Sequence, residues 1–201
     1  MDWIGRMVTV GLSPAWDISC RGGGLDWGRH VEIDEQVVRA AGKALNVSSA
    51  LAWMGRESFA AGLWGSDAYE QMRSVVARMD GLVQPRLTRT EGRTRQNITV
   101  VDTDRGREMH LRRKNDLASV ESLRRLSSDV RRLVGPDDWC VFSGAIPGEA
   151  LLEPAVGVVQ ACGELGARLV IDSYGEALRA IVDRGLAWLI APNVEELGEL
   201  L

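Results

Sequence analysis

From about residue 119 onward, helical spacing of apolar residues alternates with short, almost continuously apolar runs. Such runs are typical of strands buried on both faces, and strands that alternate with helices build a parallel sheet. The predicted helices are 42–55, 68–79, 120–134, 151–166 and 175–185. The predicted strands are 7–12, 58–65, 139–144, 167–173 and 187–192. The pattern therefore predicts an α/β protein with a mostly parallel central sheet and flanking helices.

Other segments alternate between apolar and polar residues with a period of two. "HVEIDEQVV" (30–38) does so, as do "RQNITVVD" (95–102) and "REMHLR" (107–112) on either side of a turn. This period is typical of strands with one face exposed. We therefore expect a small β lid, formed by about 17–38 and 95–112, as an appendage that covers one edge of the central sheet.

The last segment, "LIAPNVEELGELL" (189–201), contains the start of a helix without its end. Asn193 is suited to be the N-cap, and the glutamates that follow suit the positive end of the helix dipole. No glycine, basic turn or polar tail follows. We therefore expect an incomplete domain, with its C-terminal part absent and some apolar surface uncovered. The leucines expected to be exposed for this reason are Leu189, Leu197, Leu200 and Leu201.

Composition and charge narrow the cellular setting. The net charge of −4 is mild, so nothing global favours nucleic acid or an anionic membrane. No apolar run approaches the length of a membrane span, and "MDWIGRMVTV" lacks the apolar stretch of a signal peptide. The three cysteines, Cys20, Cys140 and Cys162, are widely spaced, which argues for reduced thiols and against a zinc site. A cytoplasmic protein with no membrane partner is expected.

A basic stretch raises the alternative of nucleic-acid binding. Its arginines and lysine alternate with acids and leucines as on a solvent-exposed helix face, and no aromatic residues lie between them to stack on bases. The pattern therefore favours a solvated surface over a nucleic-acid site. The residues concerned are Arg112, Arg113, Lys114, Arg124, Arg125, Arg131 and Arg132.

The stretch "AAGKALN" (40–46) is the first candidate for chemistry. It is not a P-loop, because Val37 and Ala44 occupy positions where that motif needs Gly and Ser or Thr. A Gly-Lys pair at a helix start can still bind an anion through free N–H groups and the helix dipole. Lys43 is one of only two lysines among 24 basic residues, and its compact ammonium fits a narrow pocket better than a guanidinium does.

Polar residues also follow three of the predicted strands. "SGAIPG" (143–148), "DSYGEAL" (172–178) and Asn193 each lie at a predicted carboxyl end, where open α/β sheets bind ligands. Any one of them is explained as an ordinary turn or cap. Three at successive strand ends, together with "AAGKALN", indicate a site.

These stretches together resemble the ribokinase-like (PfkB) carbohydrate kinases, most closely the branch of 1-phosphofructokinase and tagatose-6-phosphate kinase. Their order and spacing agree with the family over essentially the whole chain. The family patterns are "TVTLNPAxD", "AGGKGxNVA", "TRTNxxxxD", "SGSLPPG", "xxDTSGxAL" and "KPNxxEL". The matching stretches here are "TVGLSPAWDIS" (9–19), "AAGKALNVS" (40–48), "TRQNITVVD" (94–102), "SGAIPG", "VIDSYGEAL" (170–178) and "APNVEEL" (191–197).

The resemblance implies a ribokinase-like fold, a β lid and ATP-dependent phosphoryl transfer to a phosphorylated hexose. It implies that Lys43 and Arg95 bind the phosphate of that hexose. It also places Ser143, Asn193 and Glu196 on the nucleotide side, where Glu196 would help to hold Mg²⁺ through water beside ATP. The residues it implies for the sugar site are Asp17, Gly42, Lys43, Asn46, Arg95 and Asn97. Pairing of two copies through the lid is a further implication.

The departures from the family pattern support an alternative. Ala41 and Ala44 replace glycines, Ala191 replaces a lysine, and "HLRRKND" (110–116) replaces the acidic "NEPG" stretch. The family's Gly-Ala-Gly-Asp motif, which carries the catalytic base and an anion hole, does not occur in residues 1–201. These residues alone are therefore expected to lack kinase activity. The two hypotheses are a sugar-phosphate kinase and a non-catalytic relative that binds a sugar phosphate or a partner.

Overall fold

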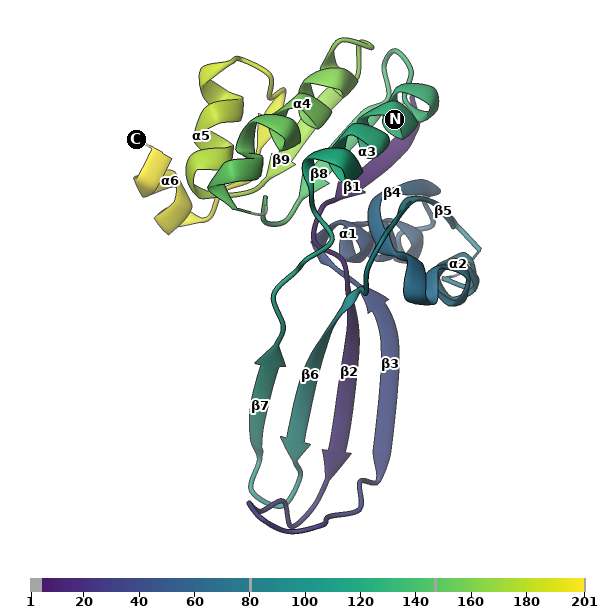
Figure 1. Ribbon diagram of the computed structural model, residues 1–201, viewed down its shortest axis with the longest axis vertical. Coiled ribbons are helices and arrows are strands. Elements are labelled where there is room, and N and C mark those ends of the chain that lie inside the picture. The colour runs from purple at the N-terminus through teal and green to yellow at the C-terminus, as the bar shows by residue number, and fades with distance from the viewer. Residues whose placement is uncertain (1–4, 80, 147, 201) are drawn as a thin grey trace.

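The computed structural model describes residues 5–79, 81–146 and 148–200. An α/β body carries a second, smaller sheet that projects away from it (Figure 1). The sheet of the body has six strands in the order β10-β9-β8-β1-β4-β5, and every neighbouring pair is parallel. Its strands are β1 (Met7–Gly11), β4 (Ser58–Gly65), β5 (Val83–Thr90), β8 (Trp139–Ser143), β9 (Arg168–Asp172) and β10 (Leu189–Ile190). The parallel sheet predicted from the sequence is confirmed.

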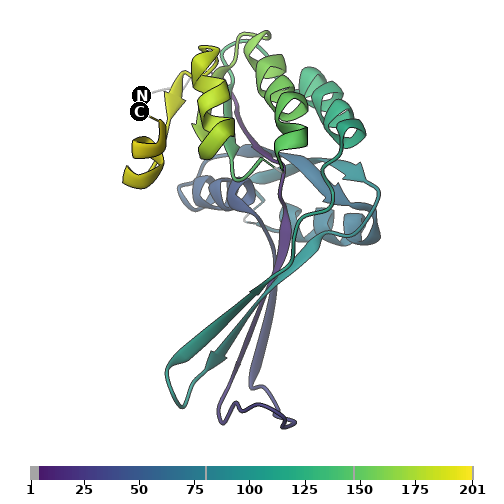
Figure 2. The same cartoon turned by 60° about the vertical axis from the view of Figure 1, so that its left-hand side comes forward.

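Helices cover both faces of this sheet. On one face α3, α4 and α5 lie side by side, and α1 and α2 cover the other (Figure 2). The helices are α1 (Lys43–Trp53), α2 (Tyr69–Ala77), α3 (Val120–Leu133), α4 (Leu152–Gly163), α5 (Gly175–Asp183) and α6 (Val194–Leu200). Two apolar clusters result, one under each layer, as a doubly covered parallel sheet requires. Among the described helices, none has the length and apolar character needed to cross a bilayer.

Strand β5 is absent from the sequence prediction. Pro85 lies within it, and a proline argues against a strand in the middle of a sheet because it has no N–H for the ladder. In the structure β5 is an edge strand that pairs with β4 alone. An edge strand tolerates proline when the missing N–H faces the open side.

The lid is a four-stranded sheet in the order β3-β2-β6-β7. Its strands are β2 (Ala15–Gly22), β3 (Glu35–Ala41), β6 (Arg95–Asp102) and β7 (Arg107–Arg112). Strands β6 and β7 have the predicted bounds. The strand predicted over 30–38 instead begins at Glu35, because pairing between β2 and β3 stops at Arg21 and Glu35. The residues between carry the chain from one strand to the other, so their alternation has no partner.

The position of the lid corrects a second expectation. The lid does not cover an edge of the central sheet. It continues from the carboxyl end of β1, which lies between β8 and β4 inside the sheet. Only three residues separate Gly11 from Ala15. The lid therefore begins at the carboxyl end of β1 and extends away from the body (Figure 1).

The leucines near residue 200 differ from one another. Leu189 and Leu197 are 48% and 41% exposed, as predicted. For Leu200 the prediction is wrong, because its side chain packs against the core under α3, α4 and α5. Leu201 lies outside the described residues.

Candidate functional site

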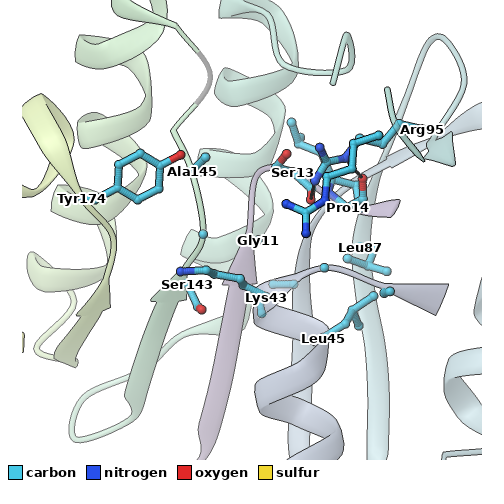
Figure 3. A pocket seen from close by; sticks show the side chains of 17 residues that line it. Gly11, Ser13, Pro14, Lys43, Leu45, Leu87, Arg95, Ser143, Ala145 and Tyr174 are labelled. Atoms are coloured by element: carbon cyan, nitrogen blue, oxygen red, sulfur yellow. Dashed lines mark hydrogen bonds between the residues drawn. The ribbon is translucent and has the colours of Figure 1, made fainter. Parts of the chain in front are cut away.

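A cavity of about 260 Å³ lies where the body meets the lid (Figure 3). It opens at the carboxyl ends of β1 and β8, the edge at which parallel α/β sheets bind ligands. The connection from β1 to β2 and the start of α1 complete its wall. The residues that line it include Gly11, Ser13, Pro14, Ala41, Gly42, Lys43, Ala44, Arg95, Arg112, Ser143, Gly144, Ala145 and Tyr174.

Gly42 and Lys43 form the start of α1 beneath the β1–β2 connection. Gly42 has φ 131°, and a Cβ atom there would lie 3.2 Å from Cα of Pro14. Glycine therefore suits both the backbone conformation and the close approach of the two segments. Lys43 is the first residue of α1, and its side chain extends into the cavity (Figure 3). This is the arrangement that the "AAGKALN" stretch predicted.

Asp172 connects Lys43 to Ser143. Ser143 and Asp172 end the neighbouring strands β8 and β9, where they are register partners. The Ser143 hydroxyl donates to Oδ2 of Asp172 at 2.6 Å, and Nζ of Lys43 lies 3.5 Å from Oδ1. Sequence reasoning noted Asp172 only as a residue at a strand end. Its role in holding Lys43 depends on a contact across 129 positions, which the sequence pattern does not show.

Arg95 reaches the cavity from the first residue of β6. Its guanidinium donates to three backbone carbonyls, those of Pro14 at 3.3 Å, Ser13 at 3.4 Å and Arg113 at 3.4 Å. A guanidinium has five N–H groups, so two remain for a ligand. Because carbonyls carry no net charge, Arg95 is held in place while its positive charge stays uncompensated.

Arg112, at the end of β7, also lines the cavity. Sequence reasoning assigned it to a solvated basic surface. The register of the lid could have shown otherwise, since Arg112 pairs with Asn97, two residues from Arg95.

Three residues that the family resemblance implies for the sugar site, Asp17, Asn46 and Asn97, lie beside the cavity. Asn97 donates from Nδ2 to Oδ1 of Asp17 at 2.8 Å across β6 and β2. Asp17 and Asn46 line a neighbouring hollow between the lid and the helices α1 and α2. Ala41 lines both spaces, so the two are adjacent.

Asn193 and Glu196 are absent from the lining of the cavity. Their side chains cap the start of α6 reciprocally: the Asn193 N–H donates to Glu196 and the Glu196 N–H donates to the Asn193 side chain, both at 2.9 Å. A capping box thus accounts for this N-x-x-E pattern by itself. One Glu196 carboxylate oxygen has no hydrogen-bond partner among the described residues.

The charged side chains that line the cavity are all positive among the described residues. Lys43, Arg95 and Arg112 line it, and none of the described lining residues is acidic. Asp172 lies behind this wall and is engaged by Ser143 and Lys43. A concave, cationic surface at strand ends is suited to bind an anionic ligand.

Comparison with known proteins shows consistent relatives. The chain is 26% identical to a 1-phosphofructokinase of Vibrio cholerae, over 96% of this chain and 60% of that protein. It is also 26% identical to the ATP-dependent 6-phosphofructokinase isozyme 2 of Escherichia coli, over 98% of this chain and 62% of that protein. The chain thus spans about three fifths of the length of these curated relatives.

Solved structures agree on the fold. Phosphofructokinase-2 of Escherichia coli in complex with fructose-6-phosphate superposes with a TM-score of 0.86 at 25% identity, over 98% of this chain and 64% of that one. A ribokinase of Arabidopsis thaliana, 17% identical, superposes with a TM-score of 0.64 over 98% of this chain and 63% of that one. The fold is therefore ribokinase-like. Residues 18–201 match the family described as pfkB family carbohydrate kinase. The chain belongs to the pfkB family of carbohydrate kinases.

Proposed function

We propose that the protein is an ATP-dependent kinase of a phosphorylated hexose, and that the cavity holds the phosphate this hexose already carries. The observation that carries the proposal is the cavity with three cations and no acidic residue among its described lining. A neutral sugar would leave Arg95 and Arg112 without a negatively charged partner, whereas a phosphate dianion pairs with them and with Lys43. The relatives with fructose phosphates in their names or titles support the same class of substrate.

The site residues divide by chemistry. Arg95 and Lys43 are the phosphate-binding groups. Asp17 and Asn97 offer hydrogen bonds to sugar hydroxyls beside Gly42 and Asn46. An Asp carboxylate that already accepts a bond from Asn97 is fixed in direction, which suits it to select one orientation of a polyol.

ATP with Mg²⁺ is the proposed co-substrate, on the side of Ser143, Asn193 and Glu196. Mg²⁺ binds through one or two carboxylates, nucleotide phosphates and several waters. Glu196 fits this description as a ligand through water, because it is only half-buried and has one carboxylate oxygen without a hydrogen bond to a described residue. Bound Mg²⁺ would neutralise charge on the nucleotide phosphates, while Asn193 orients the Glu196 carboxylate.

The alternative function is a sugar-phosphate-binding relative without catalysis. The observation that favours it is the pair Ala41 and Ala44, whose methyl groups are buried at the cavity wall where the family has glycines. Sequencing the transcript beyond codon 201 separates the two functions. An in-frame Gly-Ala-Gly-Asp motif would support the kinase, and a stop codon would support the binding module.

Binding by the 201-residue chain tests the proposed site. Calorimetric titration at fixed ionic strength should show that fructose 6-phosphate or fructose 1-phosphate binds at least about tenfold more tightly than fructose, because charged hydrogen bonds contribute about 1.5–3 kcal/mol each. Sodium sulfate serves as the control for simple anion binding. Equal affinity for fructose and its phosphates would contradict the proposal.

We also propose that two copies pair through the outer face of the lid, which is the face opposite Asp17. Register places Ile18 beside Val38 and Ile98, and Ile98 beside Leu111. Val38 and Leu111 are 47% and 49% exposed. The lid is a mixed sheet, because β2 and β6 pair in parallel, and an exposed apolar face of this kind is typical of a protein–protein interface. The related Escherichia coli enzyme has been described in a tetrameric form.

Sedimentation analysis tests this pairing. The chain should sediment as a dimer at tens of micromolar, and Leu111→Glu should yield monomers, because a buried unpaired carboxylate at the interface is costly. Ser19→Glu places the same charge on the opposite face of the lid and should leave the dimer intact. A wild-type monomer, or equal effects of the two substitutions, would refute pairing through this face.

A further inference from the structure

Arg112 and Arg95 are neighbours on one face of the lid. Arg112 is the register partner of Asn97, and Arg95 lies two residues before Asn97 on the same strand. Residues two apart on a strand point to the same face. The two arginines are therefore diagonal cross-strand neighbours, a separation that long side chains bridge. Both side chains line the same cavity.

Two guanidinium groups so placed repel each other unless an anion lies between them. No described carboxylate forms an ion pair with either one: Arg95 bonds only to carbonyls, and Arg112 has no ion pair among the described residues. Arg113, the next residue, is paired with Asp116 at 3.7 Å. The repulsion between Arg95 and Arg112 is therefore not offset by a nearby carboxylate, whereas the charge of Arg113 is offset by Asp116.

The side chains of Arg95 and Arg112 also differ in how many hydrogen bonds hold them in place. Arg95 is half-buried and fixed by three carbonyls. Arg112 is exposed at the end of its strand and has no hydrogen bond from its side chain to a described residue. A fixed guanidinium positions an anion, and a free one at the rim can close over it. Bidentate contacts of this kind are what arginine, rather than lysine, offers a phosphate.

We infer that Arg112 is a specificity-determining residue that binds the phosphate of the sugar together with Arg95. The inference rests on the proposed function, and it assigns a role to the charge reversal in "HLRRKND". The stretch that contains Arg112 replaces the acidic "NEPG" stretch of the family pattern, so the basic charge in this stretch departs from that pattern. It should raise the preference for a phosphorylated over an unphosphorylated sugar.

The test compares five forms of the chain by calorimetry with fructose 6-phosphate, fructose 1-phosphate and fructose: the wild type, Arg112→Ala, Arg112→Lys, Arg113→Ala and Arg95→Ala. Arg112→Ala should weaken binding of the phosphorylated sugars by about ten- to hundredfold, as expected for loss of a charged bidentate contact, and leave fructose unchanged. Arg112→Lys should fall between wild type and alanine, because it keeps the charge and loses the fork. Arg113→Ala, which removes the same charge one residue away, should change binding less than about twofold.

A thermal melt of each variant separates binding from folding. Arg112→Ala should melt at or above the wild-type temperature, since it removes a repulsion and no internal contact. If Arg112→Ala and Arg113→Ala bind alike while Arg95→Ala still loses phosphate binding, the role of Arg112 is refuted and the proposed function stands. If the wild type does not prefer phosphorylated sugars, both are overturned.

Discussion

Arg95→Ala is expected to weaken binding of fructose 6-phosphate by about a hundredfold, which corresponds to about 2.7 kcal/mol. The substitution removes a charge held in position by three backbone carbonyls, and hydrogen bonds to charged groups contribute about 1.5–3 kcal/mol each. Calorimetric titration measures the loss directly. In any active form, the KM for the phosphorylated sugar should rise far more than the KM for ATP.

Two further variants test whether the position of the Arg95 guanidinium, and not only its charge, determines binding. Arg95→Lys keeps the charge but cannot bond to the carbonyls of Ser13 and Pro14 while also presenting a fork to the ligand, so it should recover only part of the affinity. Arg93→Ala removes an exposed arginine two residues earlier and should bind as wild type does. Equal weakening by Arg93→Ala and Arg95→Ala would mean that overall charge, and not the position of Arg95, governs binding.

How far the sequence predicts the fold depends on whether a pattern is local. The bounds of β6 and β7 follow from alternation and a short turn, both of which are local signals. The helices and the alternation of helices with parallel strands along the chain follow from periodicity in the same way. Strand β5 was not predicted. Its Pro85 argues against a strand in the middle of a sheet, and only the structure of the whole sheet shows that β5 lies at an edge, where proline is tolerated.

The residues of the candidate site likewise differ in whether local sequence signals predict them. Lys43 and Arg95 lie in short motifs and were predicted, and the structure brings them to one cavity. Asp172 and Arg112 gained roles only from contacts between distant segments, through the β8–β9 register and the β6–β7 register. For Asn193 and Glu196 the motif also has a local explanation as a helix cap, so their assignment to the nucleotide stays a prediction.

The largest stability effect is expected at Gly62, which lies between Ala61 and Leu63, two residues that line the cavity. Gly62 in β4 pairs with Gly11 in β1, at the end of the strand that opens into the cavity. Its φ is 131°, a conformation that residues with a side chain rarely adopt. A Cβ atom there would lie 2.1 Å from the carbonyl oxygen of Gly11, so β1 and β4 would have to separate.

Gly62→Ala should therefore destabilise the chain by more than about 4 kcal/mol, a large fraction of the about 5–15 kcal/mol that stabilises a typical domain, and lower the urea midpoint accordingly. The matched control is Gly157→Ala in α4, where an added Cβ meets no heavy atom within 4 Å. A helix interior favours alanine, so this control should gain about 0.5–1 kcal/mol. The same change of residue thus has opposite signs at the two positions. If both variants unfolded at the wild-type midpoint, the close approach of β1 and β4 at Gly11 and Gly62 would be contradicted.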